Sequence, residues 1–266
     1  MTRRVRSLGW TAIALLTLGV AASCGGDGRQ TLTVFAAASL TDAFSELGDG
    51  FEAANPDINV RFNFAGSPAL VTQLGEGASA DVLATADQQH MANAIERNLV
   101  ADEGVTFARN ELVIIVPKDN PAGMTTPQDL AKPGLKLVLA SAEVPVGRYA
   151  RETLDRFAAD AAYGAAFVSD VLANVVSEEP NVKAVVTKIQ LGEADAGIIY
   201  VTDVTDDVLS DIAQVEIPDE YNVIASYPIA VTAEASDPDV AQAFIDYVLS
   251  AEGQATLEEF GFIRVR

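Results

Sequence analysis

Apolar and polar residues follow two different periodicities along this chain from Thr31 onward. Short apolar runs, typical of buried strands, occur at residues 31–36, 59–64, 81–84 and 111–116. Between the first two runs, apolar residues recur every three or four positions, as on one face of a helix that begins near Ser39. The residues on that face are Leu40, Ala43, Phe44, Leu47 and Phe51. Alternating strands and helices predict an α/β protein.

The alternation continues to the end of the chain. Further elements are expected at residues 68–75, 135–140, 149–157, 182–191, 196–201, 237–250 and 252–260. A returning strand is predicted at 227–233, where Pro228 is tolerable because it lies at the strand's start. A chain of this length can form one large domain or two small ones. We expect two lobes, with the strand at 111–116 entering the second and a ligand crevice beyond the carboxyl ends of the strands.

The first residues have the composition of a secretory signal. Basic residues at positions 3, 4 and 6 precede an apolar run over residues 10–22, which is shorter than the roughly 20 residues needed to cross a bilayer. Small residues then lead into Cys24, the only cysteine. This order resembles the lipobox of bacterial lipoproteins, which implies cleavage before Cys24 and attachment of lipid to it. An ordinary cleaved signal with an incidental cysteine is the alternative, and both the general and the twin-arginine export routes stay open.

Charge restricts the partners of the mature chain. Cleavage before Cys24 would remove three arginines and take the formal net charge from −21 to −24. Binding to nucleic acid depends on clustered Lys and Arg, and a protein this acidic is therefore not expected to bind nucleic acid. One cysteine allows no internal disulfide, and stability must come from an apolar core, for which 49% hydrophobic residues suffice.

Four segments place a small or polar residue just after a predicted strand or before a predicted helix: residues 35–41, 64–68, 144–149 and 180–183. Ser39 is expected at a helix N-cap, with Asp42 completing a capping arrangement. Ser67 precedes a proline at the first helical position. The first N–H groups of a helix lack intrahelical partners and carry the positive end of its dipole. Several helix starts aimed at one point make an anion site, although each serine alone is also an ordinary cap.

In their order along the chain and in their amino-acid sequences, these segments resemble the periplasmic molybdate-binding proteins of ABC transporters. The resemblance runs from about Thr31 to Phe262 and is strongest in VFAAASLT (34–41), ADV (80–82), ADQ (86–88), VPVGRYA (144–150) and GIIY (197–200). It implies the type II two-lobed periplasmic-binding-protein fold, with a mixed sheet flanked by helices in each lobe and the ligand cleft at the hinge. The implied division is a signal peptide at 1–23, a tether at 24–30, lobe 1 at 31–112 and 223–266, and lobe 2 at 113–222.

The resemblance also implies the residues that hold the oxyanion. These are the hydroxyls of Ser39 and Ser67 from lobe 1, and the backbone N–H groups of Val146 and Val182 with the hydroxyl of Tyr200 from lobe 2. Val146 stands where an alanine is familiar, which matters little to a backbone donor. The segment around Ser67 reads Ala-Gly-Ser-Pro and offers fewer hydroxyls than the family's serine-rich run. Without the resemblance, Tyr200 also fits a core residue with its hydroxyl at the rim.

The implied function is capture of molybdate or tungstate outside the cytoplasm and delivery to an ABC import permease. The chain contains no phosphate-binding loop, so the transport ATPase is expected to be a separate subunit. We expect a monomer with no cofactor and no free metal cation. Sulfate and phosphate stay open as ligands, because selection among tetrahedral oxyanions depends on cavity radius and on whether an acceptor faces the ligand.

An extracellular enzyme or adhesin on the same fold is the alternative of another class, because fold does not fix function. A nucleophilic enzyme is disfavoured, since Cys24 is expected to carry lipid and His90 stands alone without the context of a triad. A hydrolase with paired carboxylates stays open. Arg148 and Lys183 are expected to be solvated charges on helix surfaces. Asp203, Asp206 and Asp207 are expected to form a solvated turn, because they lack the spacing of a calcium loop.

Overall fold

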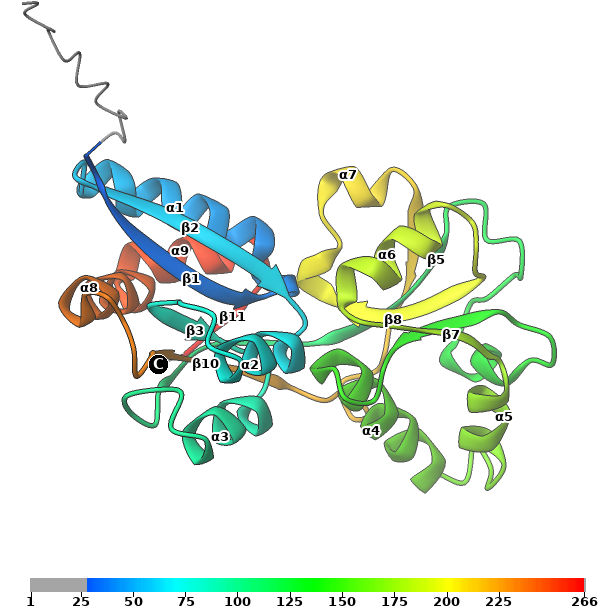
Figure 1. Ribbon diagram of the computed structural model, residues 1–266. Helices are drawn as coiled ribbons and strands as arrows, with labels where there is room; N and C mark the ends of the chain where they lie inside the picture. Colours follow the sequence, from blue (N-terminus) through cyan, green and yellow to red (C-terminus); the bar gives the residue numbers. More distant parts are fainter. Residues whose placement is uncertain (1–27, 266) are drawn as a thin grey trace, which may run out of the picture.

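The computed structural model describes residues 28–265, so the predicted signal peptide and Cys24 lie outside the described residues. Two lobes lie side by side, each built on one mixed sheet with helices on both faces (Figure 1). This arrangement confirms the predicted two-lobed α/β fold. Within the described residues, no helix combines the length and the apolar character needed to cross a bilayer.

The sheet of the first lobe has strands, in spatial order, β11 (Ile263–Arg264), β4 (Val105–Asn110), β10 (Ala225–Val231), β3 (Val82–Ala84), β1 (Gln30–Ala37) and β2 (Ile58–Ala65). Strand β1 is parallel to β2 and β3, whereas β10 is antiparallel to β3 and β4. One face of the sheet is covered by α2 (Ser67–Gly75) and α3 (Gln88–Glu96), and the opposite face by α1 (Thr41–Ala54), α8 (Pro238–Leu249) and α9 (Ala251–Glu259). Successive side chains of a strand face opposite sides, so Val34 and Phe35 belong to separate apolar clusters.

The sheet of the second lobe has strands, in spatial order, β7 (Val175–Glu179), β6 (Leu137–Ala140), β8 (Ala196–Tyr200), β5 (Leu112–Pro117) and β9 (Ile212–Val215). Strand β6 is parallel to β7 and β8, and β5 is antiparallel to β8 and β9. The helices are α4 (Pro145–Ala159) and α5 (Phe167–Ala173) on one face, and α6 (Val182–Gln190) and α7 (Asp206–Leu209) on the other. Three 3₁₀ turns complete the described chain: η1 (Ala38–Leu40), η2 (Pro127–Ala131) and η3 (Val201–Asp203).

Two adjacent connections join the lobes. The chain enters the second sheet between Asn110, the end of β4, and Leu112, the start of β5, and it returns between β9 and β10. The side-chain amide of Asn222 in the returning segment ties the two connections together. Its Nδ2 donates to the Leu112 carbonyl at 2.8 Å, and its Oδ1 accepts from the Leu112 N–H at 3.0 Å. The hinge is therefore held by the kind of paired hydrogen bonds that a neighbouring strand would supply.

Two local predictions are wrong. Pro228 does not begin its strand but lies inside β10, where the pairing with β4 shifts register between Tyr227 and Pro228. Proline lacks an N–H, so it fits a strand interior at such an irregularity. Ser39 is not an N-cap: it lies within the 3₁₀ turn η1, and the N-cap position of α1 is Leu40, which has no side-chain cap. The Ser39 hydroxyl instead contacts Tyr227.

Candidate functional site

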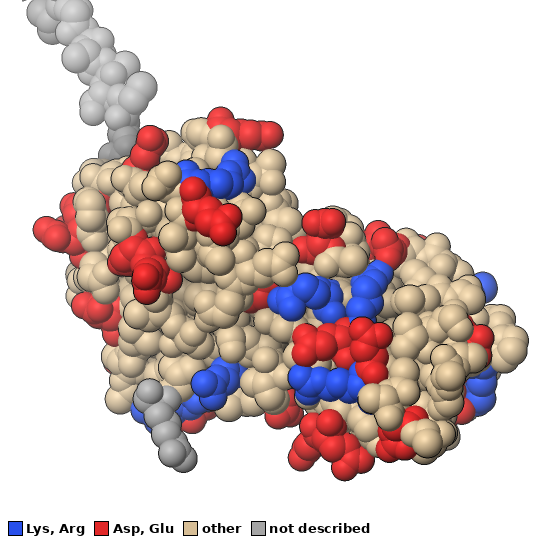
Figure 2. Space-filling model, turned by 90° about the horizontal axis from the view of Figure 1, so that it is seen from below, with Lys and Arg blue, Asp and Glu red and all other residues tan. Residues whose placement is uncertain are grey.

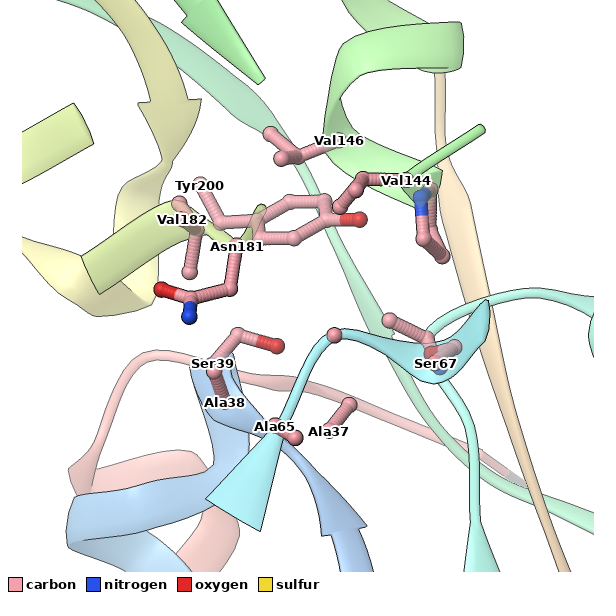
Figure 3. A pocket seen from close by; sticks show the side chains of 13 residues that line it. Ala37, Ala38, Ser39, Ala65, Ser67, Val144, Val146, Asn181, Val182 and Tyr200 are labelled. Atoms are coloured by element: carbon pink, nitrogen blue, oxygen red, sulfur yellow. The ribbon is translucent and has the colours of Figure 1, made fainter. Parts of the chain in front are cut away.

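A pocket lies between the lobes, where β1 and β2 of the first lobe and β8 of the second end (Figure 3). The structure brings all five predicted ligand residues to its lining: Ser39, Ser67, Val146, Val182 and Tyr200. The cavity is about 10 Å³, close to the smallest space that holds one water molecule. The two lobes are therefore packed closely around the site in this structure.

Ser67 enters the pocket at the start of α2 and is almost fully buried. Its Oγ accepts a hydrogen bond from the backbone N–H of Ala86 at 3.1 Å. A serine hydroxyl carries one hydrogen, and this contact uses an oxygen lone pair, so the hydrogen is left for another partner. The preceding Gly66 allows the lobes to meet, since a Cβ there would lie 2.4 Å from the Pro180 carbonyl oxygen across the cleft.

The second lobe contributes two helix starts. Pro145 begins α4, so Val146 supplies the first N–H of that helix. A Cβ at Gly147 would lie 2.3 Å from the carbonyl oxygen of Ala140, so this glycine lets α4 start against the end of β6. The helix α6 begins at Val182, and its N-cap Asn181 accepts from the Ala184 N–H at 3.0 Å. The N–H groups of Val146 and Val182 have no partner within their helices and lie at the positive ends of the helix dipoles.

Tyr200 ends β8 and is only 1% exposed, yet its hydroxyl has no hydrogen-bond partner among the described residues. Its ring packs edge-on against Tyr227, with 5.7 Å between centroids. Burial, with the neighbouring Tyr227, raises the pKa of Tyr200 well above its ordinary value, so the phenol stays protonated at neutral pH. Leaving a buried hydroxyl unsatisfied costs about 1–3 kcal/mol. The hydroxyl is therefore a donor that an oxyanion in the pocket would satisfy.

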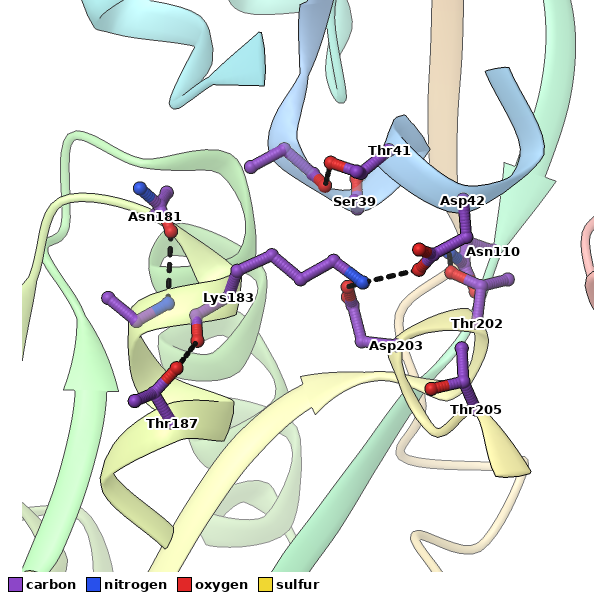
Figure 4. A network of polar contacts seen from close by, with 12 residues as sticks. Ser39, Thr41, Asp42, Asn110, Asn181, Lys183, Thr187, Thr202, Asp203 and Thr205 are labelled. Carbon is purple, nitrogen blue, oxygen red and sulfur yellow. Dashed lines mark hydrogen bonds and ion pairs between the residues drawn. The ribbon is translucent and has the colours of Figure 1, made fainter. Parts of the chain in front are cut away.

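Two ion pairs cross the cleft beside the pocket. The Arg148 guanidinium lies 2.9 Å from the Asp87 carboxylate, and the Lys183 ammonium lies 2.7 Å from Asp42 (Figure 4). The prediction that Arg148 and Lys183 are solvated charges is therefore wrong, because carboxylates of the facing lobe engage both. His90 is likewise not alone, since its ring nitrogen lies 2.9 Å from Asp87.

The pKa values of the charged groups follow from burial and these partners. Burial raises the pKa of Asp87, but hydrogen bonds and charge from His90, with Arg148, outweigh burial and hold it below its ordinary value. Burial lowers the pKa of Lys183, but the carboxylates of Asp203 and Asp42 outweigh burial and raise it. These groups therefore stay charged at neutral pH, and each cation near the pocket is balanced by a carboxylate.

Asp203 is the largest departure from the sequence prediction. It was expected in a solvated turn, but it is fully buried in η3, and the Lys183 ammonium lies 3.2 Å from its carboxylate. Burial raises the pKa of Asp203 to about 6, against the attraction of Lys183. Asp206 and Asp207 are exposed. No local pattern distinguishes Asp203 from these two, because its burial depends on contacts between distant segments.

The surface carries the acidity that the composition predicts. Figure 2 shows Asp and Glu side chains spread over both lobes, with several Lys and Arg of the second lobe close to its junction with the first. The polar lining of the pocket, by contrast, is neutral: the lining side chains are serines, small or apolar residues, Asn181 and Tyr200. An anion in the pocket would therefore meet neutral hydrogen-bond donors and helix starts.

Comparison with known proteins places this geometry in a family. The family of bacterial extracellular solute-binding proteins matches residues 32–263. The chain is 38% identical to the molybdate-binding protein ModA of Mycobacterium tuberculosis over 237 residues, 89% of this chain and 86% of the relative. Two solved structures share the fold: the sulfate-binding protein SubI of M. tuberculosis (TM-score 0.79, 18% identity, 89% of this chain and 88% of that one) and the periplasmic molybdate-binding protein of Azotobacter vinelandii (TM-score 0.75, 17% identity, 88% and 100%). The chain therefore belongs to the bacterial extracellular solute-binding proteins, as its sequence motifs predict.

Proposed function

We propose that this protein binds molybdate in the interlobe pocket, outside the cytoplasm, and delivers it to an ABC import permease whose ATPase is a separate subunit. The observation that carries the proposal is the chemistry of the lining. Ser39, Ser67 and Tyr200 are buried hydroxyls, and α4 and α6 add free N–H groups at their starts. The relatives named molybdate-binding support molybdate as the first choice.

Neutral donors offset much of the cost of transferring a dianion from water into the pocket. Each hydrogen bond to a charged acceptor contributes about 1.5–3 kcal/mol, so five such bonds contribute roughly 8–15 kcal/mol before the cost of drying the ion is subtracted. Helix dipoles at α4 and α6 add to the attraction. Because Lys183 and Arg148 are already paired with carboxylates, the ion need not break away from a cationic side chain when it is released.

Closure of the lobes is part of the proposed capture. The pocket draws its donors from both lobes, and the ion pairs Arg148–Asp87 and Lys183–Asp42 span the same cleft. A ligand that bridges the lobes favours the closed arrangement by its differential affinity for it. We propose residues 31–112 with 223–266, and residues 113–222, as the two bodies that move.

The remaining parts of the proposal rest on sequence. A signal peptide at 1–23 and lipid on Cys24 would hold a monomer at the outer face of the membrane through the tether at 24–30. Tungstate shares the shape and charge of molybdate and is the second ligand, and sulfate or phosphate is the alternative within binding. An enzyme or adhesin is the alternative of another class. An oxyanion recovered unchanged after incubation separates a binding protein from an enzyme.

The test is calorimetric titration of the mature protein with molybdate, tungstate, sulfate and phosphate. We expect saturable binding of one molybdate and much weaker binding of sulfate and phosphate. Ser39→Ala and Ser67→Ala should each weaken molybdate binding, whereas Ser45→Ala, which removes an exposed hydroxyl of α1 bonded to the Thr41 carbonyl, should not. Equal affinity for sulfate and molybdate would refute the choice of ligand, and unchanged affinity in both pocket variants would refute the site.

A further inference from the structure

Behind the pocket, a chain of buried hydrogen bonds runs from the hinge to Ser39. Asn110 and Tyr227 are fully buried, and neither lines the pocket. The Tyr227 Oη lies 3.0 Å from the Ser39 Oγ and 3.3 Å from the Asn110 Nδ2. Asn110 Nδ2 also donates to the Thr202 Oγ1 at 2.8 Å. The direction of each of these hydrogen bonds decides what Ser39 offers to a ligand.

The direction is fixed from the hinge end. The backbone N–H of Glu111, which can only donate, lies 2.9 Å from the Asn110 Oδ1. The oxygen of the Asn110 amide is therefore on that side, and its NH₂ group faces Thr202 and Tyr227. An NH₂ group only donates, so the Tyr227 oxygen accepts from it.

Tyr227 then has one hydrogen to place. Among the described residues, the Ser39 Oγ is the one further group within hydrogen-bond geometry of this hydroxyl, while the Tyr200 hydroxyl is near enough to affect the Tyr227 pKa but forms no such bond. The Tyr227 hydrogen is therefore assigned to the bond with Ser39. With a lone pair of Ser39 occupied in this way, the single hydrogen of the Ser39 hydroxyl is directed into the pocket. The hydrogen of the Ser67 hydroxyl is left free for a ligand in the same way, because the backbone N–H of Ala86 donates directly to the Ser67 Oγ.

We infer that Asn110 and Tyr227 are positioning residues that keep the Ser39 hydroxyl a hydrogen-bond donor toward the oxyanion. This inference rests on the proposed function and explains how the pocket would select a fully deprotonated oxyanion over a protonated one. A fully deprotonated oxyanion offers only acceptors and matches the pocket. A protonated oxyanion, such as hydrogen phosphate, brings a hydrogen that requires an acceptor, and Ser39 held as a donor cannot readily supply one.

The test is a double-mutant cycle on Ser39 and Tyr227, read by calorimetric titration with molybdate and with phosphate. Tyr227→Phe keeps the ring that packs on Tyr200 and removes only the hydroxyl. We expect it to weaken molybdate binding about 5- to 20-fold in the wild-type background and less than about 2-fold in the Ser39→Ala background. The ratio of molybdate to phosphate affinity should fall in Tyr227→Phe. Tyr221→Phe, which removes a tyrosine hydroxyl bonded to Asp160 away from the pocket, should change neither affinity.

Equal losses in the two backgrounds, or an unchanged molybdate-to-phosphate ratio in Tyr227→Phe, would overturn the inference while leaving the proposed function intact. Absence of molybdate binding in the wild-type protein would instead overturn the proposed function. If Tyr227→Phe fails to fold, proton NMR of the wild-type protein decides. An Overhauser contact between the Tyr227 hydroxyl hydrogen and the Ser39 β-hydrogens is expected, and a hydroxyl hydrogen that shows no proximity to Ser39 would overturn the inference.

Discussion

Removing the Tyr200 hydroxyl should separate binding from stability. In this structure the hydroxyl is buried and unpartnered, so Tyr200→Phe removes a group whose burial costs about 1–3 kcal/mol and keeps the ring contact with Tyr227. The apo variant should therefore be at least as stable as the wild type. In the complex, the variant loses one hydrogen bond to a charged oxygen, about 1.5–3 kcal/mol. Since 1.4 kcal/mol is tenfold, molybdate should bind roughly 10- to 150-fold more weakly.

The assay is differential scanning calorimetry of each protein with and without molybdate, combined with titration. The wild type should melt higher in molybdate, and the variant should show a smaller rise from an equal or higher starting temperature. Tyr247→Phe is the matched control, because it removes a hydroxyl bonded to Glu252 at 3.1 Å on the surface. Unchanged affinity in Tyr200→Phe would refute the role of the hydroxyl. A less stable apo variant would refute the reasoning that the hydroxyl is unsatisfied.

Three further changes test other parts of the account. Gly66→Ala should keep the apo fold but weaken molybdate binding more than tenfold by titration, because its Cβ would lie 2.4 Å from the Pro180 carbonyl oxygen when the lobes close; full affinity would contradict that close contact. Lys183→Met should speed molybdate release in stopped-flow measurements, since it breaks the ion pairs with Asp42 and Asp203; an unchanged rate would show that they do not hold the lobes together. Burial raises the pKa of Asp203 in the folded protein from 3.8 to about 6, so protonation of Asp203 favours the folded state. The contribution of this group to the free energy of unfolding should therefore rise as the pH falls from 6 toward 4. In urea unfolding, the free energy of unfolding of the wild type should rise by roughly 3 kcal/mol relative to that of Asp203→Asn over that pH range. A difference between the two proteins that does not change with pH would contradict the raised pKa.

The α/β fold and four of the segments that line the pocket follow from local sequence patterns, whereas the resemblance to the molybdate-binding proteins identified the five ligand residues. Strands and helices have their own periodicities, and helix starts such as Ser67 before Pro68 are marked by neighbouring residues. The patterns did not predict β4, β7, β9 and β11. Strands β7, β9 and β11 lie at sheet edges, and the burial of β4, β7 and β9 is interrupted by exposed positions. Edge strands lack the continuous apolar run that marks a buried strand.

The surroundings of the pocket could not be predicted in this way, because they depend on contacts between distant residues. Ser39 and Tyr227 are 188 positions apart, and Asp42 and Lys183 are 141 positions apart. Nothing near Ser39 in sequence indicates that its hydroxyl meets a tyrosine instead of capping α1. Nothing near Lys183 indicates that a buried carboxylate at Asp203 lies within 3.2 Å. Asn181, which both caps α6 and lines the pocket, was within a predicted segment but was not singled out.

The central claim is that donors from both lobes converge on one oxyanion, and a crystal structure of the molybdate complex tests it most directly. Anomalous scattering from molybdenum locates the ion without ambiguity. The account predicts one peak in the interlobe pocket, with oxygens about 2.7–3.2 Å from the hydroxyls of Ser39, Ser67 and Tyr200 and from the N–H groups of Val146 and Val182. A peak elsewhere on the protein, or an ion held by Lys183 or Arg148 in place of these donors, would contradict it.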